Sequence, residues 1–278
     1  MLPPFILFDL DDTLFDHQRS AHIALRAVHA AHAADLPFAP FAEEHARVLE
    51  VYHGRFLSGE LTLDEARAAR MIEAFATFAR HISHEQSLAI ADIYRREHRG
   101  NRALVPGARE LLDALAGKAR LGLITNNSVA EQFDKLRTLK IAHYFDSIVI
   151  SEDVGVIKPD KRIFDIALER LGAKADETVM VGDNLHVDIH GALNANIAAV
   201  WLKRFMHEIN SQTPASARLS EQKCPKTPAN AGVSKMNPVE INSLVPTAEA
   251  LTAIQNAYQQ HAHALKGPTH AKLETLAS

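Results

Sequence analysis

The chain has 278 residues, of which 47% are hydrophobic and 23% charged, as in a globular protein with a core domain and a smaller second one. A formal net charge of −4 argues against binding of nucleic acid or of an anionic membrane. The single cysteine, Cys224, cannot form an intramolecular disulfide, and no apolar run approaches the ~20 residues of a membrane-spanning helix. We therefore expect a cytoplasmic protein, monomeric or homodimeric.

Five short apolar runs along the chain are typical of strands in a parallel sheet. The first, Phe5–Phe8, reads FILF and is followed directly by acidic residues. Strands covered on both faces lose the alternation of apolar and polar residues, which explains the unbroken apolar runs. The other four lie at Leu121–Thr125, Ile148–Ile150, Val179–Val181 and Ile197–Leu202.

Helical patterns separate these runs. They cover Ala108–Leu115, Val129–Leu139, Lys161–Leu171 and Val187–Leu193. Strands that alternate with helices predict an α/β fold, here a Rossmann-like parallel sheet with helices on both faces. A last edge strand and a helix are expected within residues 239–265.

A different composition interrupts this alternation after the first strand. Residues 17–103 are rich in Ala, His, Arg and Glu, with apolar residues such as Phe75 and Phe78 at helical spacing. They predict an inserted α-helical cap domain, and Pro106-Gly107 marks the turn back to the core. The expected division is a core at 1–16 and 104–205 completed by 239–265, a cap at 17–103, a linker or loop at 206–238, and a flexible tail at 266–278.

Four polar motifs accompany the predicted strands. Each of them alone also fits a helix cap or a turn, because Asp, Asn and Ser favour those positions. Independent caps do not explain all four in this order. The motifs are Asp9-Leu10-Asp11-Asp12-Thr13, the turn Thr125–Ser128, Lys158-Pro159, and the segment Gly182–Asp188.

The first two motifs provide groups that can react with a phosphate and bind it. Ligands of open parallel sheets bind at the carboxyl ends of the strands, where Asp9 and Asp11 would lie. Two carboxylates there can divide the roles of nucleophile and general acid/base. The hydroxyl and backbone N–H groups at Thr125 and Asn126 can hold phosphate oxygens.

The last two motifs provide charges that suit the same chemistry. The compact ammonium group of Lys158 can balance a carboxylate and a phosphoryl oxygen together. Asp183 and Asp188 follow a predicted strand and offer the hard oxygen ligands that Mg²⁺ prefers.

Together, the motifs resemble those of the haloacid dehalogenase superfamily, in its phosphatase branch, over about Phe5 to Leu202. The helical insert is similar to that family's cap, of the type placed just after the first motif. More narrowly, the segments Ile148–Glu169 and Phe56–Leu63 resemble the pyrimidine 5′-nucleotidase subgroup. Sugar-phosphate and acylneuraminate phosphatases carry similar stretches.

The resemblance implies a Mg²⁺-dependent phosphomonoester hydrolase acting on a small phosphorylated metabolite. Asp9 would attack phosphorus and form an aspartyl-phosphate, while Asp11 would protonate the leaving oxygen and later activate water. The implied metal ligands are Asp9, the backbone carbonyl of Asp11, Asp183 and, as a further ligand or a partner of one, Asp188. The implied phosphate-binding groups are Thr125, Asn126 and Lys158. Pyrimidine nucleoside monophosphates are the first choice of substrate.

Other functions stay open at this point. A sugar-phosphate or acylneuraminate-type phosphatase would carry the same motifs. A 2-haloacid dehalogenase also uses an Asp nucleophile, but it needs no acid two residues later, so Asp11, with Thr13 and Lys158, favours phosphate chemistry. A non-catalytic binding protein on the same fold is the remaining alternative, since a fold alone does not define a function.

Overall fold

The computed structural model describes residues 1–204 and 237–266 of the chain. Nearly all of the linker or loop expected at 206–238 and of the tail expected at 266–278, together with Cys224, lies outside the described residues. Contacts along the chain separate two units. An α/β unit contains 1–14, 105–125 and the described residues from Ile141 onward, and a helical unit contains 15–104 and 126–140.

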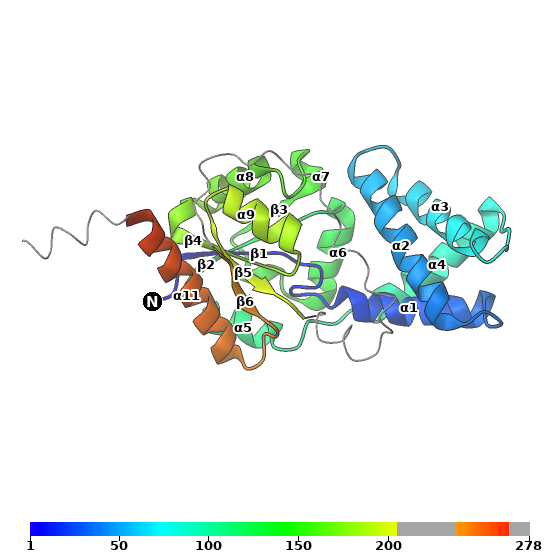
Figure 1. Ribbon diagram of the computed structural model, residues 1–278, viewed down its shortest axis with the longest axis horizontal. Coiled ribbons are helices and arrows are strands. Elements are labelled where there is room, and N and C mark those ends of the chain that lie inside the picture. Colours follow the sequence, from blue (N-terminus) through cyan, green and yellow to red (C-terminus); the bar gives the residue numbers. More distant parts are fainter. Residues whose placement is uncertain (205–236, 267–278) are drawn as a thin grey trace, which may run out of the picture. The chain divides into compact units, whose positions relative to one another are not determined.

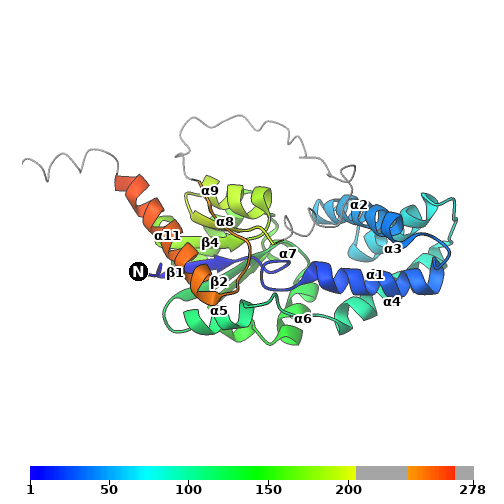
Figure 2. The same cartoon turned by 60° about the horizontal axis from the view of Figure 1, so that its bottom comes forward.

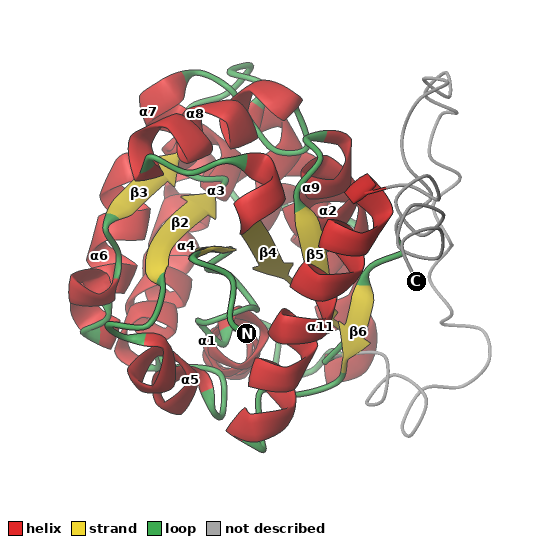
Figure 3. Ribbon diagram, turned by 90° about the vertical axis from the view of Figure 1, so that its left-hand side faces the viewer, coloured by secondary structure: helices red, strands yellow, loops and turns green. Residues whose placement is uncertain are grey.

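The α/β unit is built on a parallel six-stranded sheet (Figures 1 and 3), which confirms the fold class predicted from the sequence. The order of its strands is β3-β2-β1-β4-β5-β6. The strands are β1 (Phe5–Phe8), β2 (Arg120–Thr125), β3 (Ser147–Ile150), β4 (Thr178–Gly182), β5 (Ala198–Leu202) and β6 (Val239–Ile241).

Helices cover this sheet. α8 packs against β2 and β3, whereas α11 packs against β4, β5 and β6 and also contacts α5. Side chains of β1, β2 and β3 join those of α8 and α9 in one apolar core. The helices of this unit are α5 (Ala108–Leu115), α7 (Ser151–Val154), α8 (Lys161–Leu171), α9 (Gly191–Asn194) and α11 (Thr247–Lys266).

The segment after β4 differs from the helix predicted at Val187–Leu193. Residues Leu185–His190 form a π-helical turn, and the short α9 follows it. The side-chain oxygen of Asn184 accepts hydrogen bonds from the backbone N–H groups of His186 and Val187, which fixes the start of this turn. Such wide turns are common near functional sites and are not encoded by apolar periodicity.

The helical unit contains α1 (His17–His32), α2 (Phe38–Leu57), α3 (Leu63–Ala76), α4 (His84–Gly100) and α6 (Val129–Leu139). Figure 2 shows α1 beside α4, the pair with the most extensive packing in this unit. Two helices begin with capping boxes, Thr62 with Glu65 on α3 and Ser83 with Gln86 on α4, which satisfy their first N–H groups. An ion pair of Glu131 on α6 with Arg67 of α3 ties α6 to this unit.

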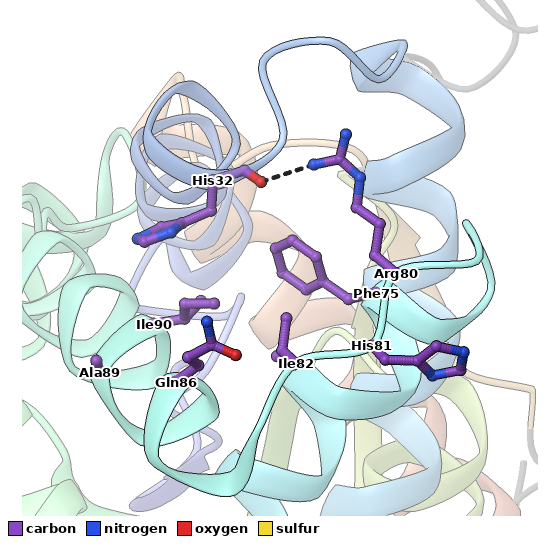
Figure 4. A pocket seen from close by; sticks show the side chains of 8 residues that line it. All are labelled: His32, Phe75, Arg80, His81, Ile82, Gln86, Ala89 and Ile90. Carbon is purple, nitrogen blue, oxygen red and sulfur yellow. Dashed lines mark hydrogen bonds between the residues drawn. The ribbon is translucent and has the colours of Figure 1, made fainter.

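The core of the helical unit is apolar and aromatic, with Phe41, Met71 and Phe75 almost fully buried. One end of it is hollowed by a pocket of about 480 Å³ (Figure 4). Arg80 at this pocket donates a hydrogen bond to the carbonyl oxygen of His32 and forms an ion pair with Asp35. Among the described residues, no helix is both long enough and apolar enough to cross a membrane.

Candidate active site

Strand register brings the first and last motifs to one edge of the sheet. Phe8 of β1 lies opposite Leu123 of β2 and Val181 of β4, so these parallel strands end side by side. The backbone N–H of Asp9 donates to the carbonyl oxygen of Val181 at 3.0 Å, which extends the pairing by one residue. Asp9 is thereby held beside Gly182, at the carboxyl ends where ligands of such sheets bind.

A buried lysine links two of the carboxylates at this edge. The Nζ atom of Lys158 lies 2.6 Å from Oδ1 of Asp9 and 2.6 Å from Oδ1 of Asp188, and it donates to the carbonyl oxygen of Ile124 at 2.9 Å. The side chain of Lys158 is only 2% exposed. A lysine is rarely buried unless it is paired, so these acceptors explain how the ammonium group is tolerated here.

A glycine makes room for Asp188. A Cβ atom on Gly182 would lie 2.5 Å from the Cβ atom of Asp188, a distance that real Cβ atoms do not show. The other carboxylate oxygen of Asp188 accepts a hydrogen bond from the backbone N–H of Asn184 at 3.1 Å. The π-helical turn and Gly182 therefore fix the position of this carboxylate against the end of β4.

Thr13 lies between the first and last motifs. Its hydroxyl group is within hydrogen-bond distance of Oδ2 of Asp9, at 3.2 Å, and of Oδ1 of Asp183, at 3.3 Å. The indole N–H of Trp201 on β5 donates to the backbone carbonyl of Asp183 at 2.8 Å. Thr13 belongs to the first motif but was not predicted as a site residue, and nothing in the local sequence indicated Trp201.

Three carboxylates converge beside the lysine. Asp9, Asp183 and Asp188 each offer an oxygen atom, and these atoms all lie within 4.8 Å of one another. When all three are ionised, their negative charge exceeds the single positive charge of Lys158. A set of carboxylate oxygens with excess negative charge fits a hard divalent cation such as Mg²⁺.

Burial, together with the excess of negative charge, shifts the pKa values of the site. The pKa of Asp9 is raised to about 7, mainly by burial and also by the charges of Asp188 and Asp11, against the opposing effect of Lys158. The pKa of Asp183 is also raised well above its usual value, first by burial and then by Asp188 and Asp9. Burial lowers the pKa of Lys158, but the attraction of Asp188 and Asp9 outweighs it and raises the pKa overall.

The remaining residues predicted for the site are Asp11, Thr125 and Asn126. Asp11 is near enough to raise the pKa of Asp9, and its side chain is partly exposed. Thr125 is buried at the end of β2, opposite Ile150 of β3, in the α/β unit. Asn126 is the first residue of the second segment of the helical unit, whereas the other predicted site residues belong to the α/β unit.

The comparisons with known proteins place the chain in a family. Residues 5–196 match the family model of the haloacid dehalogenase-like hydrolases. The chain therefore belongs to the haloacid dehalogenase-like hydrolase family. This finding confirms the resemblance that the four motifs indicated.

Curated relatives of the chain carry the names of phosphatases. It is 38% identical over 161 residues to the pyrimidine 5′-nucleotidase YjjG of Escherichia coli, a match that covers 58% of this chain and 63% of that protein. The chain thus matches less than two thirds of the length of YjjG. It is 33% identical over 209 residues to a glyceraldehyde 3-phosphate phosphatase of Methanothermobacter thermautotrophicus, covering 73% of this chain and 87% of the relative.

A solved structure shares the fold. The crystal structure of the HAD-hydrolase YfnB from Bacillus subtilis, bound to magnesium, covers 90% of this chain and 99% of its own, with a TM-score of 0.66. The two sequences are 24% identical. At this level of identity, the similarity establishes only the α/β fold with its helical insertion.

Proposed function

We propose that the protein is a Mg²⁺-dependent phosphomonoester hydrolase that forms an aspartyl-phosphate on Asp9. The observation that carries this proposal is the buried ammonium group of Lys158 between Asp9 and Asp188, at a sheet edge that also holds Asp183. A nucleophilic carboxylate needs to stay ionised beside an anionic substrate, and a fixed positive charge favours the ionised form.

Asp9 and Asp11 divide the chemistry in two steps. An oxygen of Asp9 forms a bond to phosphorus as the ester P–O bond breaks, and Asp11 gives its proton to the leaving oxygen. A water molecule then attacks phosphorus, its proton passes to Asp11, and inorganic phosphate leaves as Asp9 regains its carboxylate. Thr125, Asn126 and Lys158 would bind the phosphoryl oxygens on which charge accumulates.

Asp9, Asp183 and Asp188 would hold Mg²⁺ together with the backbone carbonyl of Asp11. When bound, the cation supplies positive charge that reduces repulsion between the carboxylate nucleophile and the phosphate. The Thr13 hydroxyl lies within hydrogen-bond distance of both Asp9 and Asp183 and can donate its one proton to either carboxylate. Asp188 also accepts hydrogen bonds on both carboxylate oxygens, so it orients Lys158 in addition to any bond it makes to the cation.

The proposed substrates are small phosphorylated metabolites, with pyrimidine nucleoside monophosphates first. The 38% identity to a pyrimidine 5′-nucleotidase supports this choice. Sugar or triose phosphates are the second candidate, supported by the similarity to a glyceraldehyde 3-phosphate phosphatase over a larger share of the chain. A panel of nucleoside monophosphates and sugar phosphates, assayed for phosphate release with Mg²⁺ and with EDTA, separates the two.

The nucleophile is tested by Asp9→Asn, which removes the negative charge while keeping the shape of the side chain. We expect kcat for p-nitrophenyl phosphate to fall by about 10⁴-fold or more, since groups that act as one catalytic unit cannot replace a lost nucleophile. Circular dichroism should show an unchanged fold. Retained turnover in this variant would refute the assignment of Asp9.

A further inference from the structure

The helical unit contains a second group of buried polar side chains. Arg70 of α3 lies with its guanidinium carbon 4.8 Å from the ring centre of Tyr94 on α4. The ring centre of His45 on α2 is 5.1 Å from that of Tyr94, and the ring of His98 stacks on Tyr94 at 6.0 Å. His98 in turn shares a hydrogen bond of 3.2 Å with His17 of α1. We call these five residues the Arg70 cluster.

Arg70 is buried, and the described residues give it no counter-charge. The residue is 8% exposed, and its Nε atom is fully buried with no hydrogen-bond partner among the described residues. The groups that affect its pKa besides burial are Tyr94 and Arg67, and neither is a carboxylate. An ionised guanidinium in such a place is costly unless an anion binds to it.

Two neighbours of Arg70 also have unused polar atoms. The hydroxyl oxygen of Tyr94 and Nε2 of His45 are fully buried, and neither has a hydrogen-bond partner among the described residues. These residues are 7% and 3% exposed. Since nearly all buried polar groups in native proteins are hydrogen-bonded, three such atoms around one ring indicate that a ligand completes the cluster.

Other arginines of the helical unit differ from Arg70 in their burial or in their pairing with carboxylates. The side chain of Arg102 is 3% exposed, and it forms ion pairs with Asp134 at 2.7 Å and with Glu131 at 3.4 Å. Arg80, at the pocket of Figure 4, is paired with Asp35. Arg26 lies 4.2 Å over the ring of Phe38, as Arg70 lies over Tyr94, but Arg26 is exposed to solvent. Arg70 thus combines the burial of Arg102 with the lack of a carboxylate partner.

We propose that Arg70, together with Tyr94 and His45, forms a binding site for a carboxylate or phosphate group. The planar guanidinium can donate two parallel hydrogen bonds to two oxygens of such a group. The Tyr94 hydroxyl can donate a further one, and His45 can donate through Nε2 in the matching tautomer. The anion has two sources, a free small molecule or an acidic group on the substrate of the proposed hydrolase.

Direct binding tests this site without using catalysis. Malonate, a small dicarboxylate, is titrated into the full-length protein in the presence of EDTA, and its affinity is measured by calorimetry. In Arg70→Met we expect its affinity to fall by roughly tenfold to a hundredfold, the loss typical of a hydrogen bond to a charged group. Arg26→Met removes a guanidinium over an aromatic ring at an exposed position and should leave the affinity unchanged. Equal binding of malonate to the wild type and to Arg70→Met would overturn the proposal.

Stability in the absence of any anion separates a binding role from a structural one. Arg70→Met removes an unpaired buried charge and keeps an apolar stem, so its melting temperature should equal or exceed that of the wild type. Tyr94→Phe keeps the ring under Arg70 and should weaken malonate binding a few-fold with an unchanged melting temperature. A clear drop in the melting temperature of Arg70→Met, with malonate affinity unchanged in Tyr94→Phe, would show a structural role and overturn the proposal.

A pair of substrates then distinguishes the two sources of the anion, a step that rests on the proposed hydrolase activity. Phosphoserine and phosphoethanolamine differ only by a carboxylate on the leaving group. If the site binds that carboxylate, the kcat/KM of phosphoserine divided by that of phosphoethanolamine falls toward one in Arg70→Met. The same ratio is unchanged in Arg26→Met. If the ratio is unchanged while malonate binding is lost, the site binds a free anion. Absence of all phosphatase activity would refute the hydrolase but would not affect the malonate result.

Discussion

Two of the buried cations among the described residues, Lys158 in the α/β unit and Arg70 in the helical unit, have opposite surroundings. Lys158 in the α/β unit is held between two carboxylates, with a third nearby, so its surroundings carry an excess of negative charge. Arg70 in the helical unit lies over the phenol ring of Tyr94 with Arg67 also near, and the described residues give it no carboxylate partner. The first arrangement fits a cation as its ligand and the second fits an anion. The uncompensated charge in each region therefore indicates whether its ligand is a cation or an anion.

Among the changes considered, removal of Lys158 should have the largest effect on the free energy of unfolding. In Lys158→Met, Asp9, Asp183 and Asp188 face one another without a positive charge, and we expect the free energy of unfolding in EDTA to fall by about 3–5 kcal/mol. The loss should be smaller at low pH, where the carboxylates take up protons. Urea unfolding measures it.

A matched control for this variant is Lys161→Met. Lys161 pairs with Asp165, but both side chains are about half exposed, and exposed pairs add little to stability. Equal stability of the two variants would show that the charges around Lys158 are not coupled as described.

Mg²⁺ should stabilise the α/β unit by binding to its three carboxylates. A ligand at 100 times its dissociation constant adds about 2.7 kcal/mol to the free energy of unfolding. Without metal, the raised pKa values of Asp9 and Asp183 mean that the folded state binds more protons than the unfolded state between pH 4 and 7. Stability in EDTA should therefore fall as the pH rises through this window.

With Mg²⁺ the trend in the same window should reverse, because the metal binds the deprotonated carboxylates and competes with their protons. Melting temperatures measured from pH 5 to pH 8, with and without the metal, test this. Identical pH profiles in EDTA and in Mg²⁺ would argue against a metal site at these three residues.

The smallest expected effect lies in the Arg70 cluster. The pKa of His45 is well below its ordinary value, first because the residue is buried and then because of Arg70 and His17. The unfolded state therefore binds the extra proton below about pH 6.5, and stability should fall by about 1.4 kcal/mol per pH unit in that range. In His45→Phe this acid-side slope should decrease by that amount, as measured by thermal unfolding between pH 7 and pH 5. A slope equal to that of the wild type would show that His45 is not held neutral.

Much of the α/β unit could be predicted because its signals are local. The unbroken apolar runs at Phe5–Phe8 and Val179–Val181 identify strands covered on both faces, and they are β1 and β4 in the structure. The motifs that follow them gave Asp9 and Asp183 as candidate site residues, and these two do come together with Lys158 and Asp188. Parallel strands share one carboxyl edge, so the positions after the strands could be expected to converge.

The sequence by itself determined the elements and the chemistry available at their ends, since apolar periodicity and capping act over a few neighbouring residues. Only the tertiary structure decided which groups meet. Lys158 reaches Asp9 across 149 residues, and Thr13 reaches Asp183 across 170, because strand order and register align those ends. The isolation of Arg70 is likewise invisible in the sequence. Whether a charge finds a partner depends on what packs around it in three dimensions, and the other members of the Arg70 cluster come from three other helices.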